Sequence, residues 1–126
     1  MAKRASGFTD TFATLRGILK AYEGKLVVQA DTPSAYQLSS PTMKDRVGRP
    51  LFVAAVQIKK NYVSYHLMPV YALPALAKGI SPGLKRRMQG KSCFNFTTLD
   101  PAHVEELEAL TRDGIARFKN FKLPWA

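Results

Sequence analysis

The clearest pattern in the chain is the distribution of hydrophobic and polar residues along positions 51–67, LFVAAVQIKKNYVSYHL. A two-residue turn at Lys60-Asn61 would make this segment a β-hairpin, in which alternate side chains point to opposite sides. Three apolar pairs would then lie on one side: Ile58 with Val63, Val56 with Tyr65, and Ala54 with Leu67. We expect this side to face the core.

The other side of the same hairpin is polar in an unusual way. It would carry Gln57, Tyr62, Ser64 and His66 beside Val53 and Ala55. This mixture neither fills a core nor resembles a surface covered with Lys and Glu. We interpret it as a candidate binding surface.

Helical spacing of apolar residues predicts a helix near each end of the chain. The first covers residues 8–23 and the second covers about 18 residues after Asp100-Pro101, a typical start for a helix. Gly114 lies on the apolar stripe of the second helix, which predicts a close approach to the sheet. Residues 91–97 alternate, so we expect a strand with Phe94 and Phe96 inward and Asn95 on the polar face.

The remaining segments are short. Residues 26–30 and 35–39 favour two strands, or one strand and an irregular edge. Residues 41–50, PTMKDRVGRP, predict a surface loop that could cover a site. Residues 70–78 predict a helix broken at Pro74, and Ser81-Pro82 predicts the start of a helix over residues 83–89.

Together these elements predict one α+β domain over residues 1–126, with residues 1–7 and 120–126 as terminal tails. Its mostly antiparallel sheet would have about four or five strands, with the first and last helices packed on one face. The single cysteine, Cys93, and the lack of any apolar run near ~20 residues favour a cytoplasmic protein without a membrane partner.

Charge points to one class of partner. The net charge is +10, and residues 1–99 hold 15 Lys and Arg against four acidic residues, which would attract polyanions such as nucleic acid. The densest cluster is Lys85, Arg86, Arg87 and Lys91. It is a candidate polyanion site, and equally it can be the solvated end of a short helix.

Catalytic and metal chemistry has little support. His66, Cys93 and His103 match no metal-ligand spacing, and there is no glycine-rich phosphate loop or catalytic triad pattern. We therefore expect a protein without a cofactor or metal that is not an enzyme, although catalysis by His66 and Cys93 stays a weaker alternative.

Residues 51–118 resemble the bacterial YdhG-like domain family, small cytoplasmic α/β domains of unknown function. The resemblance rests on FVAAVQIKKNYVSYHL (52–67), ISPGLKRRMQGKSCFNF (80–96) and LDPAHVEELEALTRDGIARF (99–118), in that order. One branch of that family is proposed to be a frataxin-like iron chaperone, so the resemblance implies iron carriage. Such carriage needs clustered carboxylates, whereas only Glu105, Glu106 and Glu108 come close together here.

The sequence thus favours a binding module that is not an enzyme. Its ligand, a small or anionic molecule, would contact five residues of the polar sheet face, roofed by residues 41–50: Gln57, Tyr62, Ser64, His66 and Asn95. Polyanion or nucleic-acid binding by the basic cluster is the alternative. Trp125, which follows Pro124, is a candidate anchor for a homodimer.

Overall fold

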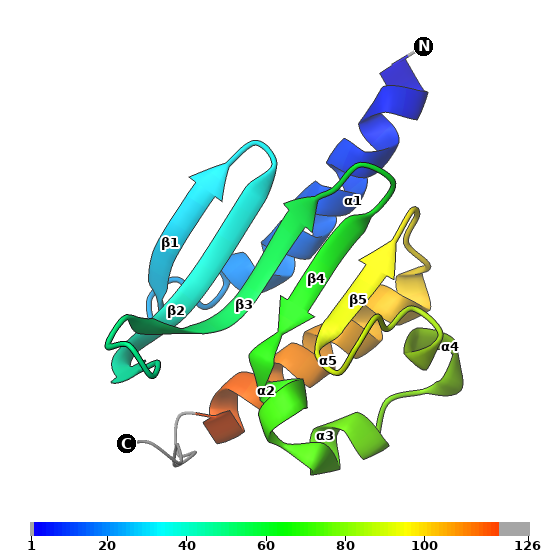
Figure 1. The fold of residues 1–126 in the computed structure, drawn as a ribbon. Coiled ribbons are helices and arrows are strands. Elements are labelled where there is room, and N and C mark those ends of the chain that lie inside the picture. Colours follow the sequence, from blue (N-terminus) through cyan, green and yellow to red (C-terminus); the bar gives the residue numbers. More distant parts are fainter. Residues whose placement is uncertain (1, 119–126) are drawn as a thin grey trace.

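The computed structural model describes residues 2–118, and the side chains of residues 8–118. It contains five helices and five strands in this part of the chain (Figure 1). In chain order they are α1 (Ala2–Lys20), β1 (Val27–Thr32), β2 (Ala35–Lys44), β3 (Pro50–Ile58), β4 (Val63–Leu67), α2 (Met68–Ala72), α3 (Pro74–Lys78), α4 (Pro82–Lys85), β5 (Cys93–Phe96) and α5 (Pro101–Phe118). Among these residues, no helix is long and apolar enough to span a membrane.

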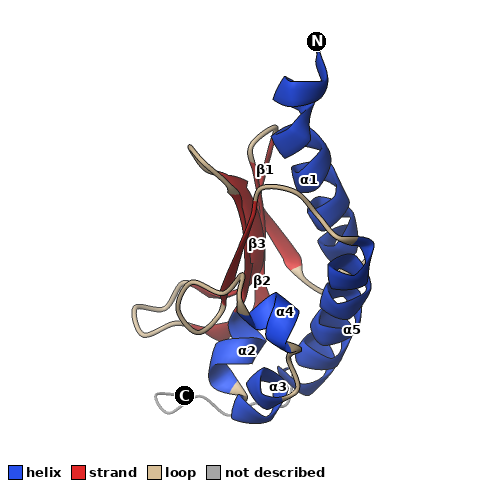
Figure 2. Cartoon of the chain, turned by 90° about the vertical axis from the view of Figure 1, so that its right-hand side faces the viewer, coloured by secondary structure: helices blue, strands red, loops and turns tan. Residues whose placement is uncertain are grey.

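The strands form one antiparallel sheet in which each strand pairs with the next along the chain, in the order β1-β2-β3-β4-β5. Seen along the edge of the sheet, the long helices α1 and α5 lie on the same side of it (Figure 2). The expected α+β fold, with the first and last helices on one face, is confirmed. Within residues 2–118, no long helix lies over the opposite face of the sheet (Figure 2).

The core lies between the sheet and the two long helices. Leu15 and Leu19 of α1 and Leu107 of α5 are fully buried against the sheet. The Tyr65 hydroxyl of β4 and the Thr111 hydroxyl of α5 are also buried and share a 2.6 Å hydrogen bond. This bond gives both buried hydroxyl groups a partner where α5 crosses the sheet.

The predicted hairpin register is confirmed. Ile58 pairs with Val63, Val56 with Tyr65 and Ala54 with Leu67, and the Lys59 N–H donates to the Tyr62 carbonyl across the Lys60-Asn61 turn. All six paired residues except the half-buried Ile58 are buried.

One residue of β3 lies on the other side of the sheet from the prediction. Val53 was expected beside Gln57 on the polar face, but it is buried in the core. The reason is a β-bulge: Leu38 of β2 pairs with Ala54 and the next residue, Ser39, pairs with Phe52, so Val53 has no partner. The extra residue reverses the alternation of side chains, so Phe52 takes the place of Val53 on the polar face.

The N-terminal half differs from the prediction at element ends. Helix α1 begins at Ala2, within the expected tail of residues 1–7, and ends at Lys20. Strand β2 continues to Lys44 rather than ending at residue 39, so the expected ten-residue loop shortens to residues 45–49. The Asp45 carboxylate stabilises this tight loop by accepting the N–H groups of Val47 and Arg49 at 3.0 and 2.9 Å.

The C-terminal half follows the prediction more closely. The helix expected over residues 70–78 is split into α2 and α3 before Pro74, and α5 has the expected 18 residues. Ser81 caps α4 as expected, its hydroxyl accepting the Leu84 N–H at 3.2 Å, although α4 ends at Lys85. Gly114 does make a close approach, but to α2 and α3 rather than to the sheet: a Cβ there would lie 3.0 Å from Cβ of Pro69.

Two glycine substitutions test this packing. Gly114→Ala should lower the free energy of unfolding by about 1 kcal/mol, because ~1–3 kcal/mol of overpacking outweighs a helix-propensity gain of about 1 kcal/mol. Gly17→Ala is the control, because the exposed Gly17 has no atom within 4 Å of a new Cβ. It should raise stability by ~0.5–1 kcal/mol in urea unfolding. Equal effects of the two changes would contradict the close approach at Gly114.

Candidate functional site

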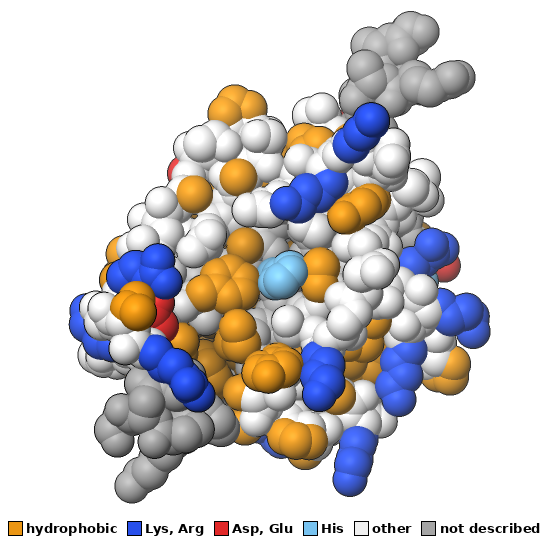
Figure 3. Space-filling view, viewed as in Figure 1, with side chains coloured by type: hydrophobic (Ala, Val, Ile, Leu, Met, Phe, Trp, Pro, Cys, Tyr) orange, Lys and Arg blue, Asp and Glu red, His pale blue; other side chains and the backbone are white. Residues whose placement is uncertain are grey.

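The uncovered face of the sheet contains a shallow hollow of about 130 Å³. Residues of the three central strands line it: Gln37, Phe52, Ala55, Gln57, Ser64 and His66. Figure 3 views this face, with a histidine near its middle among hydrophobic and uncharged side chains, and Lys and Arg side chains around its margin. The hollow therefore offers neutral hydrogen-bonding groups beside aromatic rings.

Strand register brings these groups together. Ser64 of β4 pairs with Gln57 of β3 on one side and with Asn95 of β5 on the other. His66 likewise pairs with Ala55 and Cys93. Directly paired residues on one face of an antiparallel sheet have Cβ atoms about 4.5–5.5 Å apart, so one ligand can contact several of these side chains at once.

An aromatic pair forms the wall of the hollow. The ring centroids of Phe52 and His66 lie 5.7 Å apart and the rings are inclined by 62°, an edge-to-face arrangement. This contact depends on the β3 bulge, because without it Phe52 would point into the core.

Partial burial favours the neutral forms of two titratable groups on this face, His66 and Cys93. It lowers the pKa of His66, and the nearby positive charge of Lys59 lowers it further. Burial raises the pKa of the Cys93 thiol above its ordinary value, against a smaller opposing effect of Lys59. The thiol donates a weak hydrogen bond to Asn95 Oδ1, at 3.5 Å. Neutral imidazole can donate and accept hydrogen bonds, so it adds to the neutral groups of the hollow.

Carboxylates are kept away from the hollow. None of the six residues that line it is acidic. Of the nine acidic residues in the chain, five lie between Asp100 and Asp113, and Asp10 and Glu23 belong to α1 and the turn that follows it. The last two are each bound to an arginine, Asp31 to Arg16 and Asp45 to Arg49. An anion on this face would therefore meet little repulsion.

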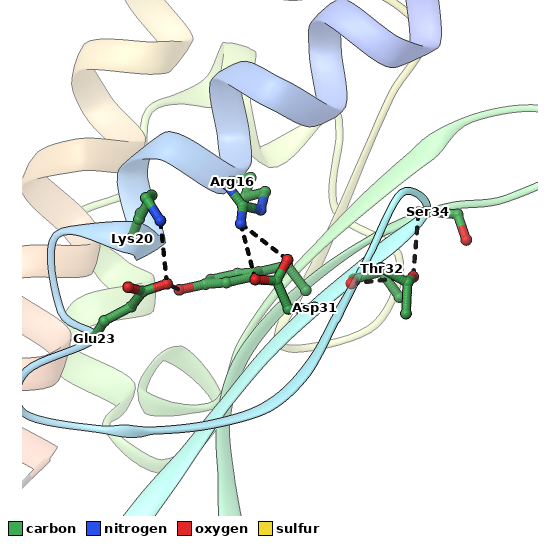
Figure 4. A network of polar contacts seen from close by, with 8 residues as sticks. Arg16, Lys20, Glu23, Asp31, Thr32 and Ser34 are labelled. Atoms are coloured by element: carbon green, nitrogen blue, oxygen red, sulfur yellow. Dashed lines mark hydrogen bonds and ion pairs between the residues drawn. The ribbon is translucent and has the colours of Figure 1, made fainter.

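A network of polar contacts lies elsewhere, where α1 meets β1 and β2 (Figure 4). Arg16 contacts both carboxylate oxygens of Asp31, at 2.9 and 3.1 Å, and its guanidinium lies 4.7 Å from the centre of the Tyr36 ring. The buried Tyr36 hydroxyl bonds to Glu23, which also pairs with Lys20 at 3.6 Å. The polar groups of this network are one another's hydrogen-bond and ion-pair partners. The network is therefore best explained as a structural contact that holds α1 against the sheet.

The predicted site residues are only partly brought together. Gln57, Ser64 and His66 line the hollow, Asn95 lies next to Ser64 in register, and Tyr62 precedes β4 and is not among the lining residues. The expectation that residues 41–50 cover this site is wrong, because none of them lines the hollow.

Sequence reasoning missed Gln37 and Phe52. The polar Gln37 between Tyr36 and Leu38 was a usable signal in the sequence. Such alternation predicts that the two neighbours face the core, where both are buried, and that Gln37 faces the other side. Phe52 had no such signal, because residues 51–56 are all hydrophobic and no local feature marks the bulge.

The basic cluster lies at the edge of the sheet rather than on its open face. Lys85, Arg86 and Arg87 are exposed at and just after the end of α4, and the residues that follow pair with the outer edge of β5 through Met88 and Phe94. Lys91 is separate, with its Nζ 5.9 Å from the centre of the Tyr71 ring. Among the described residues, no ion pair is found for these four cations.

A second hollow, of about 120 Å³, lies between β2 and α5. It is mostly apolar, with Leu26, Met43, Val53, Ile115 and Phe118 among the residues that line it. The Ser40 hydroxyl lines it as well, but it already accepts the N–H groups of Thr42 and Met43. This hollow offers few groups that could orient a polar ligand.

Comparison with known proteins adds no relative. No family model matches the chain, and neither the curated proteins nor the solved structures contain a match. The resemblance to the YdhG-like family stays a prediction. Among the described residues, no group of three or more His, Cys, Asp or Glu could hold a metal ion.

The lowered pKa of His66 makes a testable contribution to stability. As pH falls, the unfolded chain takes up this proton first, near its ordinary pKa of 6.5, so the contribution is complete above that pH and is lost below it. The free energy of unfolding should fall between about pH 7.5 and about pH 5.5, and should fall less in His66→Gln. Urea unfolding of both proteins at both pH values measures this. An identical pH dependence would mean that His66 is not desolvated.

Proposed function

We propose that this protein is a binding module, not an enzyme, whose ligand is a small or anionic molecule bound on the open sheet face. The observation that supports this most strongly is the convergence of Gln57, Ser64 and His66 in a hollow with no carboxylate. Polar side chains are ordinary on a solvated sheet face, but here they surround a hollow that also contains the ring pair of Phe52 and His66, a combination typical of ligand sites.

The alternative of catalysis by His66 and Cys93 has weaker support. A nucleophilic cysteine needs a lowered pKa, whereas the pKa of Cys93 is raised. Its thiol donates to Asn95 Oδ1, so the hydrogen bond that is present favours the neutral thiol. The two residues fit better as hydrogen-bonding and packing groups of a binding surface.

Polyanion binding by Lys85, Arg86, Arg87 and Lys91 is the second candidate, supported by the exposure of all four side chains. It ranks lower because Lys91 lies apart from the other three cations, with its Nζ 5.9 Å from the centre of the Tyr71 ring. Iron carriage, which the family resemblance implies, has no cluster of carboxylates among the described residues to support it.

The triple substitution Gln57→Ala, Ser64→Ala and His66→Ala tests the proposal. Binding of a panel of anions (inorganic phosphate, citrate, AMP and UMP) should weaken by about tenfold or more for those that bind the wild type, because each lost hydrogen bond is worth ~0.5–1.5 kcal/mol. The free energy of unfolding should stay within about 1 kcal/mol of the wild type or rise. Isothermal titration calorimetry and urea unfolding measure the two effects.

The control is Thr14→Ala with Gln89→Ala, two exposed polar residues outside the hollow, which should change neither quantity. A loss of more than about 3 kcal/mol in the triple variant would mean that the face is a satisfied polar core. Unchanged affinity would show that the anions bind elsewhere.

A further inference from the structure

The size of the hollow limits what its ligand can be. Sites that enclose a drug-sized molecule or cofactor have volumes of about 300–1,000 Å³. This hollow, at about 130 Å³, is large enough for one flat ring but not for a whole cofactor. A ligand that uses it must therefore lie mainly across the sheet and place one group inside.

The character of the hollow favours an aromatic ring with hydrogen-bonding edges. Phe52 and His66 supply ring surfaces, and Gln37, Gln57 and Ser64 supply both donors and acceptors around them. A nucleic-acid base has a flat face for stacking and polar edges for hydrogen bonds.

Positively charged side chains lie near both ends of β4, on either side of the hollow. Near the hairpin turn, Lys59 lies two residues beyond Gln57, and its N–H donates to the Tyr62 carbonyl at 2.7 Å, so the alternation of side chains places Lys59 on the open face. Beyond the other end of β4, the exposed Tyr71 of α2 lies against Lys91, a second aromatic side chain next to a cation. Aromatic side chains combined with nearby basic groups are typical of surfaces that bind single-stranded nucleic acid.

We propose that the open sheet face binds single-stranded nucleic acid, with one base in the hollow against Phe52 and His66 and with flanking phosphates at Lys59 and Lys91. This inference rests on the proposed function and specifies its ligand. Duplexes bind less well, because their bases are stacked inside and cannot enter the hollow. The proposed base stacking and phosphate contacts do not involve the sugar, so both RNA and DNA strands should bind.

Fluorescence anisotropy with labelled oligouridylate and oligothymidylate of about ten nucleotides tests the inference. Both should bind at about 50 mM salt and lose about sevenfold in affinity by about 200 mM salt, as expected for the two phosphate contacts at Lys59 and Lys91. Phe52→Leu, which keeps an apolar side chain but removes the ring, should weaken binding about fivefold or more. Lys59→Ala with Lys91→Ala should reduce the salt dependence.

The control for charge is Lys85→Ala with Arg86→Ala. It removes two positive charges, as the Lys59/Lys91 variant does, but from the edge of the sheet. Its affinity for the oligonucleotides should stay within about twofold of that of the wild type. A preference for only one of the two oligonucleotides would still support the inference, and oligodeoxyuridylate, which shares its sugar with one and its base with the other, would show whether the sugar or the base methyl group decides it. If Lys85→Ala with Arg86→Ala abolishes binding and Phe52→Leu does not, the basic cluster is the site and the inference is wrong.

A different result separates the inference from the proposed function. If neither oligonucleotide binds at low salt while phosphate, citrate or a nucleotide binds the wild type and not the Gln57/Ser64/His66 variant, the face is a site for a small anion and only the nucleic-acid inference fails. If none of these probes binds, both fail.

Discussion

The register of the β3–β4 hairpin determines which side chains lie on each face of the sheet. Because side chains alternate, a slip of one residue would bring Gln57, Ser64 and His66 into the core and expose Val56 and Tyr65. Burial of Val56, Tyr65 and Leu67 against the helices makes such a slip costly. The same hydrophobic pairing that builds the core therefore holds the polar groups of the opposite face in one row.

The lining of the hollow is also uncharged. The carboxylates lie in the α5 segment, in or just after α1, or in ion pairs with Arg16 and Arg49, whereas the hollow is lined only by uncharged groups. The bulge at Val53 completes the surface, since it moves an aromatic ring to the face where His66 lies.

Sequence reasoning succeeded where structure depends on local pattern. The Lys60-Asn61 turn, the stripe of α5 and the break at Pro74 each follow from a few neighbouring residues, and so does the placement of Gln57, Ser64 and His66 on one face. Sequence reasoning failed where the position of a side chain depends on pairing between strands. Gln37 reaches the hollow only because β2 pairs with β3, and the exchange of Val53 for Phe52 depends on how β2 fits a run of six hydrophobic residues.

The central claim is that ligands bind the open sheet face rather than the basic edge. The most direct measurement is a map of amide chemical shifts in the isotope-labelled protein, titrated with whichever of the anions and oligonucleotides binds most tightly. The account predicts that the largest changes occur in β3 and β4, around Phe52, Gln57 and His66. Changes confined to residues 85–91, with β3 and β4 unaffected, would contradict it.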